Sequence, residues 1–170
     1  MSYADHPAAG ERIILNTAER VTDYDLERFG GIHFHNLGGE PMFVGSAVFT
    51  HDDGRIKSVH PCKIGPHLHP HVCSVAYGGE EISHRGRYDL LVINDEKMEW
   101  VPTGHGRVPE GRIPVDGGHE EDGKKLFHAR ARLHNHNNVG VPGKTGHHLG
   151  SAHVSFGGEE IEVREHYDIL

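Results

Sequence analysis

Three histidines alternate with other residues in one short segment: His67, His69 and His71. Residues two apart lie on one face of a strand, where three imidazoles could bind zinc or another divalent transition metal. Two further His-x-His pairs, at residues 33–35 and 134–136, have the same spacing. Against a metal site, Pro66 and Pro70 interrupt regular strand geometry, and no carboxylate stands at a recognisable ligand spacing. Adventitious metal binding is therefore the alternative interpretation.

A second candidate combines an acidic, glycine-flanked turn with an isolated lysine. The acids are Glu120, Glu121 and Asp122, and the lysine is Lys144 in the sequence Pro-Gly-Lys. A carboxylate accepts two hydrogen bonds and an ammonium donates up to three, so such a pair can hold the vicinal diol of a sugar. Acidic turns beside glycines are also common as solvated surface turns. Residue types alone favour that simpler interpretation.

Nucleophilic catalysis has little support in the sequence. Cys62 and Cys73 have histidines nearby, but proximity in a chain with 18 histidines is weak evidence for a thiolate–imidazole pair. Serine-hydrolase, phosphate-loop and zinc-protease motifs are absent. His69, His71 and Glu80 vaguely resemble the ligands of a cupin-type metalloenzyme, but the spacing from glycine to histidine is wrong. We expect no enzymatic activity, no required cofactor and two free thiols.

Charge and hydropathy narrow the function classes. A net charge of −8 argues against general nucleic-acid binding, although protonation of all 18 histidines would change it to +10. No apolar run approaches the roughly 20 residues that a membrane helix needs, so we expect no membrane insertion. The first residues lack a basic region followed by an apolar block. We expect a cytoplasmic protein, or one released without a cleavable signal peptide and possibly bound at the cell surface.

Internal repetition determines the expected architecture. Four blocks recur in the same order at nearly constant separation: residues 41–49 with 125–133, 61–68 with 142–149, 75–82 with 154–161, and 88–91 with 167–170. Matched positions in the first pair of blocks alternate and carry small residues, which predicts strands approached closely by another backbone. The chain is therefore one unit written twice.

The turn signals complete this prediction. Each Gly-Gly-Glu-Glu sequence predicts a tight hairpin whose glycines supply positive φ. No window carries a sustained helical period, although residues 22–29 could form one short turn of helix. We expect an all-β fold with antiparallel sheets related by a pseudo-two-fold axis. Residues 1–12 would form a flexible N-terminal tail, 13–93 the first repeat and 94–170 the second, within one globular unit.

Several of these motifs, in this order, resemble the DM9 repeat: Trp100-Val101-Pro102, Gly117-Gly118-His119, Ala129-Arg130-Ala131, Pro142-Gly143-Lys144, Gly157-Gly158 and Tyr167. The second half of the chain covers the pattern from end to end. The first half matches from about Gly38 to Leu91 and lacks the opening Trp-Val-Pro. Together the two matches cover nearly the whole chain.

The resemblance implies a protein similar to the tandem-DM9 lectins of invertebrates, which are all-β, dimeric and mannose-binding. In these lectins an acid in the glycine-rich turn and the lysine of the Pro-Gly-Lys turn hold the sugar hydroxyls. Carried over by position, these are Glu120 and Lys144 in the second repeat, and Asn36 and Lys63 in the first. The lectin type has aspartate where this chain has Glu120, and Asn36 has lost the charge. Glu121 and Asp122 are alternatives to Glu120, and the second repeat is expected to hold the better site.

The predicted function is that of a carbohydrate-binding lectin, a homodimer that recognises mannose-containing glycans as a pattern-recognition or agglutinating protein of innate immunity. A single site of this kind would bind weakly, and duplication would raise its effective strength on a multivalent surface. Two alternatives remain. One is a His-rich metal-binding protein on the same β scaffold, and the other is a structural interaction module without sugar binding.

Overall fold

The computed structural model describes residues 8–30 and 34–170, and strands predominate in them. Beside one α-helix and one short 3-10 helix, η1, the elements are strands, which confirms the all-β prediction. In chain order they are β1 Arg12–Asn16, α1 Asp23–Gly30, β2 Phe34–His35, β3 Pro41–Thr50, β4 Ile56–Ile64, β5 Cys73–Tyr77, β6 Glu80–Ser83, β7 Arg87–Leu91, β8 Val101–Thr103, β9 Asp116–His119, β10 Lys125–Leu133, η1 His134–His136, β11 Val139–Thr145, β12 Ala152–Phe156, β13 Glu159–Val163 and β14 Tyr167–Ile169.

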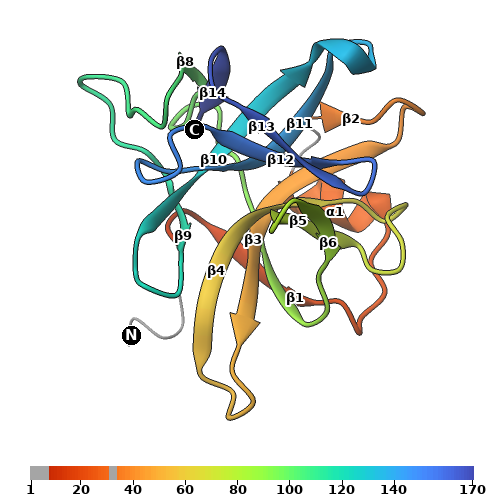
Figure 1. Ribbon diagram of the computed structural model, residues 1–170. Helices are drawn as coiled ribbons and strands as arrows, with labels where there is room; N and C mark the ends of the chain where they lie inside the picture. Colours follow the sequence, from red (N-terminus) through yellow and green to blue (C-terminus); the bar gives the residue numbers. More distant parts are fainter. Residues whose placement is uncertain (1–7, 31–33) are drawn as a thin grey trace.

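These strands form one 14-stranded sheet in the order β1-β7-β3-β4-β5-β6-β13-β12-β11-β10-β14-β8 (Figure 1). β2 adds to β3, and β9 pairs with both β10 and β4. Strands of the two halves therefore pair at two places in the sheet: β6 pairs with β13, and β4 pairs with β9. The two long hairpins, β3–β4 and β10–β11, project in different directions from this centre (Figure 1).

Two-residue glycine turns form the hairpins at the centre of the sheet, as predicted. Gly78 and Gly79 have φ of +63° and +85°, and Gly157 and Gly158 have φ of +62° and +85°. Positive φ at both central residues is the type I′ geometry that suits the twist of a hairpin. The two hairpins then contact each other through one bridge, Glu80 with Glu159.

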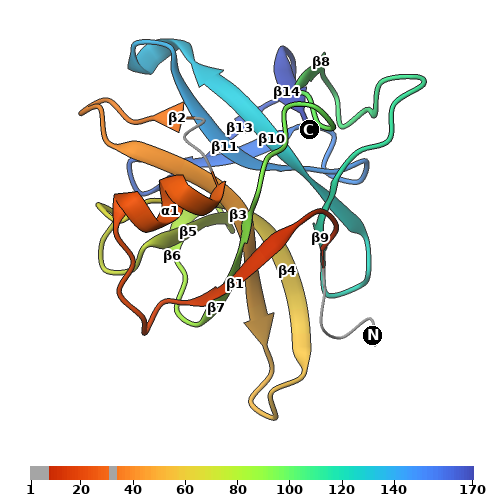
Figure 2. The ribbon, with the colours of Figure 1, turned by 180° about the vertical axis from the view of Figure 1, so that it is seen from behind.

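The short predicted helix is present as α1. Thr22 caps its start: the Asp25 amide donates to Thr22 Oγ1 at 3.2 Å, and the Thr22 amide donates to Asp25 Oδ2 at 3.0 Å. Leu26, buried at 1% exposure, fixes the helix to the core. Figure 2 shows α1 lying against the face of the sheet near β3.

Each half of the chain has its own hydrophobic cluster, and a third joins them. Tyr88 lies in the first cluster and Tyr167 in the second. The expected close backbone approach is found at Gly45, where an added Cβ would lie 2.5 Å from the Asp89 carbonyl oxygen of β7. The tight strand contact therefore excludes a side chain at position 45.

The N-terminal part of the chain packs against both halves. Arg12 pairs with Leu91 at the start of β1, and its guanidinium donates to Ser46 Oγ at 2.9 Å and to the Asp116 carbonyl at 3.2 Å. Residues 1–7 of the predicted tail lie outside the described residues. Within the described chain, no helix is both long enough and apolar enough to cross a membrane.

Candidate functional site

Lys144 lies in β11 between its partners His128 of β10 and His153 of β12. The residue is 3% exposed, and its Nζ lies 3.3 Å from His60 Nδ1 and 5.0 Å from the centre of the Tyr77 ring. His60 and Tyr77 belong to the first half of the chain. The surroundings of Lys144 are therefore built by both halves.

The electrostatics of Lys144 and His60 agree with this contact. Burial lowers the pKa of Lys144, whereas the charges of Glu120 and Glu160 raise it. Burial, followed by the charge of Lys144, lowers the pKa of His60 to about 3. His60 is therefore neutral at pH 7, and its Nδ1 accepts from the ammonium while Nε2 faces Ser58 Oγ at 3.1 Å.

The acidic turn links β9 to β10 and directs Glu120 inward. The Glu120 amide donates to the Lys124 carbonyl at 2.9 Å, and the Gly123 amide donates back to the Glu120 carbonyl at 3.0 Å. Glu120 Oε1 lies 3.3 Å from His148 Nε2, with both side chains about one-fifth exposed. In the described chain Glu120 forms no ion pair with Lys144 within 4 Å, but its charge raises the pKa of Lys144.

The two acids that follow Glu120 point to solvent. Glu121 lies 3.9 Å from Lys57. Asp122 lies 3.0 Å from the Lys124 ammonium, and the backbone hydrogen bond from Lys124 lowers the pKa of Asp122. Of the three acids, Glu120 has the most buried side chain, and its charge raises the pKa of Lys144.

Lys63 occupies the corresponding place in the first half, in β4. Its Nζ donates to the Ser155 carbonyl at 2.7 Å and pairs with Glu81 Oε2 at 3.3 Å. The Phe156 ring lies 5.9 Å away, where Lys144 has Tyr77. Burial lowers the pKa of Lys63, and the charge of Glu81 raises it. This ammonium is already bound by the chain itself.

Asn36 takes the turn position that corresponds to Glu120. Its amide donates to the Glu40 carbonyl at 2.9 Å, and the Gly39 amide donates to the Asn36 carbonyl at 3.0 Å, as in the Glu120 turn. The Asn36 side-chain oxygen accepts from the amides of Gly38 and Glu40 at 2.9 and 3.1 Å. Its side chain therefore completes its own turn and supplies no carboxylate to Lys63.

The family model for the DM9 repeat matches residues 36–163. The chain belongs to the DM9-repeat family. This family is associated with carbohydrate binding and consists of binding modules rather than enzymes. The match covers both turn positions, both lysines and both Gly-Gly hairpins. Comparison with curated proteins gives no match.

The predicted metal ligands of this DM9 protein lie in the loop between β4 and β5, not on a strand, because Pro66 and Pro70 interrupt the extended backbone. His67 is half-buried, and neither ring nitrogen has a hydrogen-bond partner. His69 is exposed, while the amide of His71 donates to Ser83 Oγ at 3.1 Å. In the described chain, no three His, Cys, Asp or Glu side chains are arranged to hold a metal ion.

The pair formed by His134 and His136 does not have the predicted strand geometry either. Residues 134–136 form η1, whose histidines are exposed, and His33 lies outside the described residues. Cys62 and Cys73 are buried free thiols, as predicted. Burial raises the pKa of Cys73 well above its usual value, which opposes a reactive thiolate.

Sequence reasoning missed five residues around Lys144 and Glu120: His60, Tyr77, His148, His153 and Glu160. The repeat alignment contained a partial signal, because Glu160 ends the second Gly-Gly-Glu-Glu and His148 follows the lysine by four residues. The two residues from the first half had no such signal. Their proximity depends on how the halves pair.

Two surface hollows lie away from this site. One, of about 720 Å³, is lined by the loop around Arg107 and the turn at His166. Another, of about 500 Å³, is lined by the same turn and by Glu162. Neither is lined by a residue predicted to bind sugar, and the second is lined by the histidine pair His134 and His136.

Proposed function

We propose that this DM9 protein is a lectin that binds mannose-type glycans through Glu120 and Lys144. One observation supports it most: the Lys144 ammonium is buried, its pKa is raised by the charge of Glu120, and it forms no ion pair within 4 Å in the described chain. A buried charge without a counter-ion is costly unless hydrogen bonds satisfy it. The adjacent hydroxyls of a pyranose would accept from Lys144 and donate to Glu120.

We further propose that residues 13–93 and 94–170 are two tandem DM9 repeats about a pseudo-two-fold axis between β6 and β13. Support comes from the strand order, in which β7-β3-β4-β5-β6 is followed by β13-β12-β11-β10-β14. The bridge between them joins Glu80 to Glu159, the same position of each Gly-Gly-Glu-Glu sequence. An antiparallel bridge between equivalent residues is what a two-fold axis requires.

One monosaccharide site of this size would be weak. Each charge-assisted hydrogen bond contributes about 1.5–3 kcal/mol before ordering and desolvation are subtracted, which leaves a dissociation constant on the order of micromolar to millimolar. A homodimer would present two such sites to a glycan surface and gain avidity without new contacts. Such binding suits recognition and agglutination of glycan-coated particles.

Calorimetry with methyl α-mannoside tests this proposal. We expect one site per chain, and the same affinity after treatment with a chelator, since Glu120 and Lys144 need no metal. Methyl β-galactoside and glucoside in the same series would report sugar selectivity. No heat with any of these sugars, and no signal on a glycan array, would rule out the lectin function.

The acid can be tested with matched variants in one turn. Glu120→Gln keeps the size of the side chain but loses the charge, so we expect about a tenfold loss of mannoside affinity. Glu121→Gln is the control, because Glu121 points to solvent and should leave the affinity unchanged. If the control alone weakened binding, the turn register assigned to the acid would be wrong.

A further inference from the structure

Two glutamates at matching hairpin positions have different partners. Glu81 and Glu160 both end a Gly-Gly-Glu-Glu turn, and their amides donate to the carbonyls of Gly158 and Gly79 at 3.0 and 3.1 Å. The backbone therefore places them alike. Yet Glu81 pairs with Lys63 at 3.3 Å, whereas Glu160 forms no ion pair with Lys144 in the described chain.

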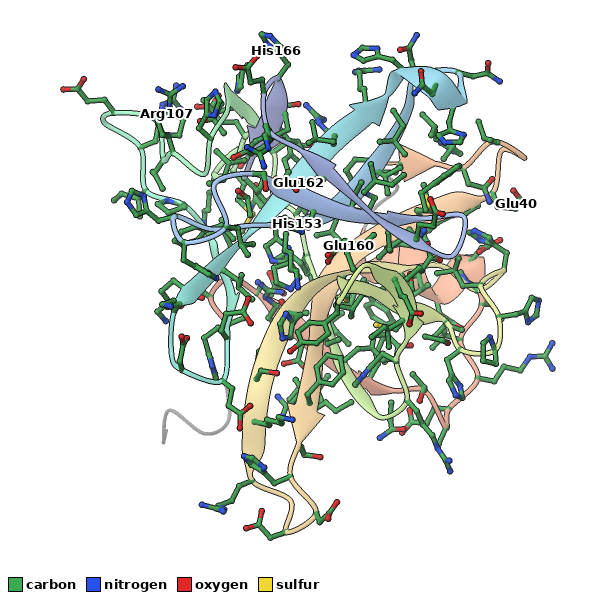
Figure 3. The ribbon with its side chains drawn as sticks, viewed as in Figure 1. Glu40, Arg107, His153, Glu160, Glu162 and His166 are labelled. Atoms are coloured by element: carbon green, nitrogen blue, oxygen red, sulfur yellow. The ribbon has the colours of Figure 1, made fainter. Side chains whose placement is uncertain are left out.

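The carboxylate of Glu160 is held by other groups. Its Oε1 lies 3.4 Å from His153 Nδ1, and the Gly79 amide donates to the same oxygen at 3.3 Å. The side chains of Glu160 and His153 are only 15% and 17% exposed, so solvent competes little for this contact. Figure 3 shows the two side chains in the centre of the molecule, where β12 and β13 lie side by side.

His153 is itself fixed in place. Its other ring nitrogen, Nε2, lies 2.9 Å from Ser151 Oγ. In the tautomer whose Nδ1–H donates to Glu160, Nε2 accepts from this hydroxyl. Ser151 is fully buried. One nitrogen of the His153 imidazole therefore contacts Ser151, in the loop before β12, and the other faces Glu160.

The first half has a different residue at the same place. Strand register pairs Lys144 with His153, and it pairs Lys63 with Ser74. Ser74 is too short to hold the hairpin glutamate, and its hydroxyl lies 3.3 Å from Ser155 Oγ. Because Ser74 does not hold its carboxylate, Glu81 forms an ion pair with Lys63.

We propose that His153 is a positioning residue that keeps Glu160 off Lys144 and so leaves the ammonium free for a ligand. That the ligand is a sugar rests on the proposed function. That Lys144 has no carboxylate partner does not depend on it. The residue opposite each lysine, Ser74 in the first half and His153 in the second, then determines whether the hairpin glutamate pairs with that lysine. In this proposal Glu160 does not contact the sugar; it is the carboxylate that His153 holds away from Lys144.

The test is a cycle of variants with two readouts. His153→Ser copies the first half, and we expect Glu160 to pair with Lys144. The Lys144 pKa, followed by NMR of its ε-carbon, should rise by about one unit. Affinity for methyl α-mannoside should fall by about tenfold. Adding Glu160→Gln should reverse both effects, because the amide carries no charge.

Controls separate positioning from general damage. His153→Gln, whose amide can still donate to Glu160, should retain most of the affinity and the wild-type Lys144 pKa. Glu159→Gln, on the exposed neighbour, should change neither. An unchanged Lys144 pKa in folded His153→Ser, or no recovery on adding Glu160→Gln, would overturn the inference. Absence of sugar binding in the wild type would instead defeat the proposed function, and the pKa readout would still decide the role of His153.

Discussion

The Lys63 site and the Lys144 site share a backbone frame but differ in whether the chain satisfies its own lysine. Both lysines are nearly fully buried, both lie in the second strand of a long hairpin, and both face an aromatic ring from the opposite half. Lys63 has a carbonyl and a carboxylate as partners, whereas Lys144 has a neutral imidazole. A shared frame therefore does not imply a shared function.

Two positions explain the difference. At the turn, Glu120 supplies a carboxylate where Asn36 turns back on its own backbone. Opposite each lysine, His153 or Ser74 determines what the hairpin glutamate contacts. On the proposed function, the first change removes the acceptor for a sugar hydroxyl, and the second removes the free donor. Either change alone would weaken a diol-binding site.

The largest expected contrast comes from neutralising each lysine. Lys144→Met keeps the side-chain length but removes the ammonium, and we expect mannoside affinity to fall by about 3 kcal/mol, on the order of a hundredfold. Lys63→Met should leave the affinity within about twofold, since Lys63 is already bound. Calorimetry on both variants, with circular dichroism to confirm folding, makes the comparison. Equal losses in the two variants would show that the sites are not different in kind.

The local parts of this site were predictable from sequence. The Gly-Gly turns, the strands around each lysine and the acidic turn follow from residue spacing and from the φ that glycine allows. The neighbours across the halves were not. Tyr77 reaches Lys144 because two hairpins meet at the bridge between Glu80 and Glu159, a contact that no local periodicity encodes. The histidine segment at 67–71 failed as a strand because its prolines outweigh its alternation.

Acid should affect the Lys144 site through His60. The unfolded chain binds a proton at His60 below its usual pKa of 6.5, whereas the folded chain binds it only near pH 3. Stability is therefore present above pH 6.5 and is lost as the pH falls towards 3. Between pH 7 and 5 this one histidine should cost about 2 kcal/mol. The corresponding residue in the other half is the buried Val141, which does not titrate.

Replacing the imidazole tests this assignment. His60→Gln can still accept a hydrogen bond from Lys144 but does not titrate, so denaturant unfolding should show a loss between pH 7 and 5 that is smaller than that of the wild type by about 2 kcal/mol. His51→Gln, at the exposed tip of the β3–β4 hairpin, serves as the control and should leave the pH dependence unchanged. Burial also lowers the pKa of His84 and His128, so some acid sensitivity should remain. The same slope in His60→Gln and wild type would argue against this origin.

The smallest effect is a gain: opening the closed site. Asn36→Glu places a carboxylate where the backbone already matches the Glu120 turn, and Glu81→Gln releases Lys63 from its ion pair. The double variant should show a second mannoside site in calorimetry, at least about tenfold weaker than the first, because Lys63 still donates to the Ser155 carbonyl. Asn36→Glu alone should show no second site, since the lysine remains closed. A second mannoside site of equal affinity in Asn36→Glu alone and in the double variant would contradict this. The turn acid, and not the hairpin glutamate, would then account for the difference between the two halves.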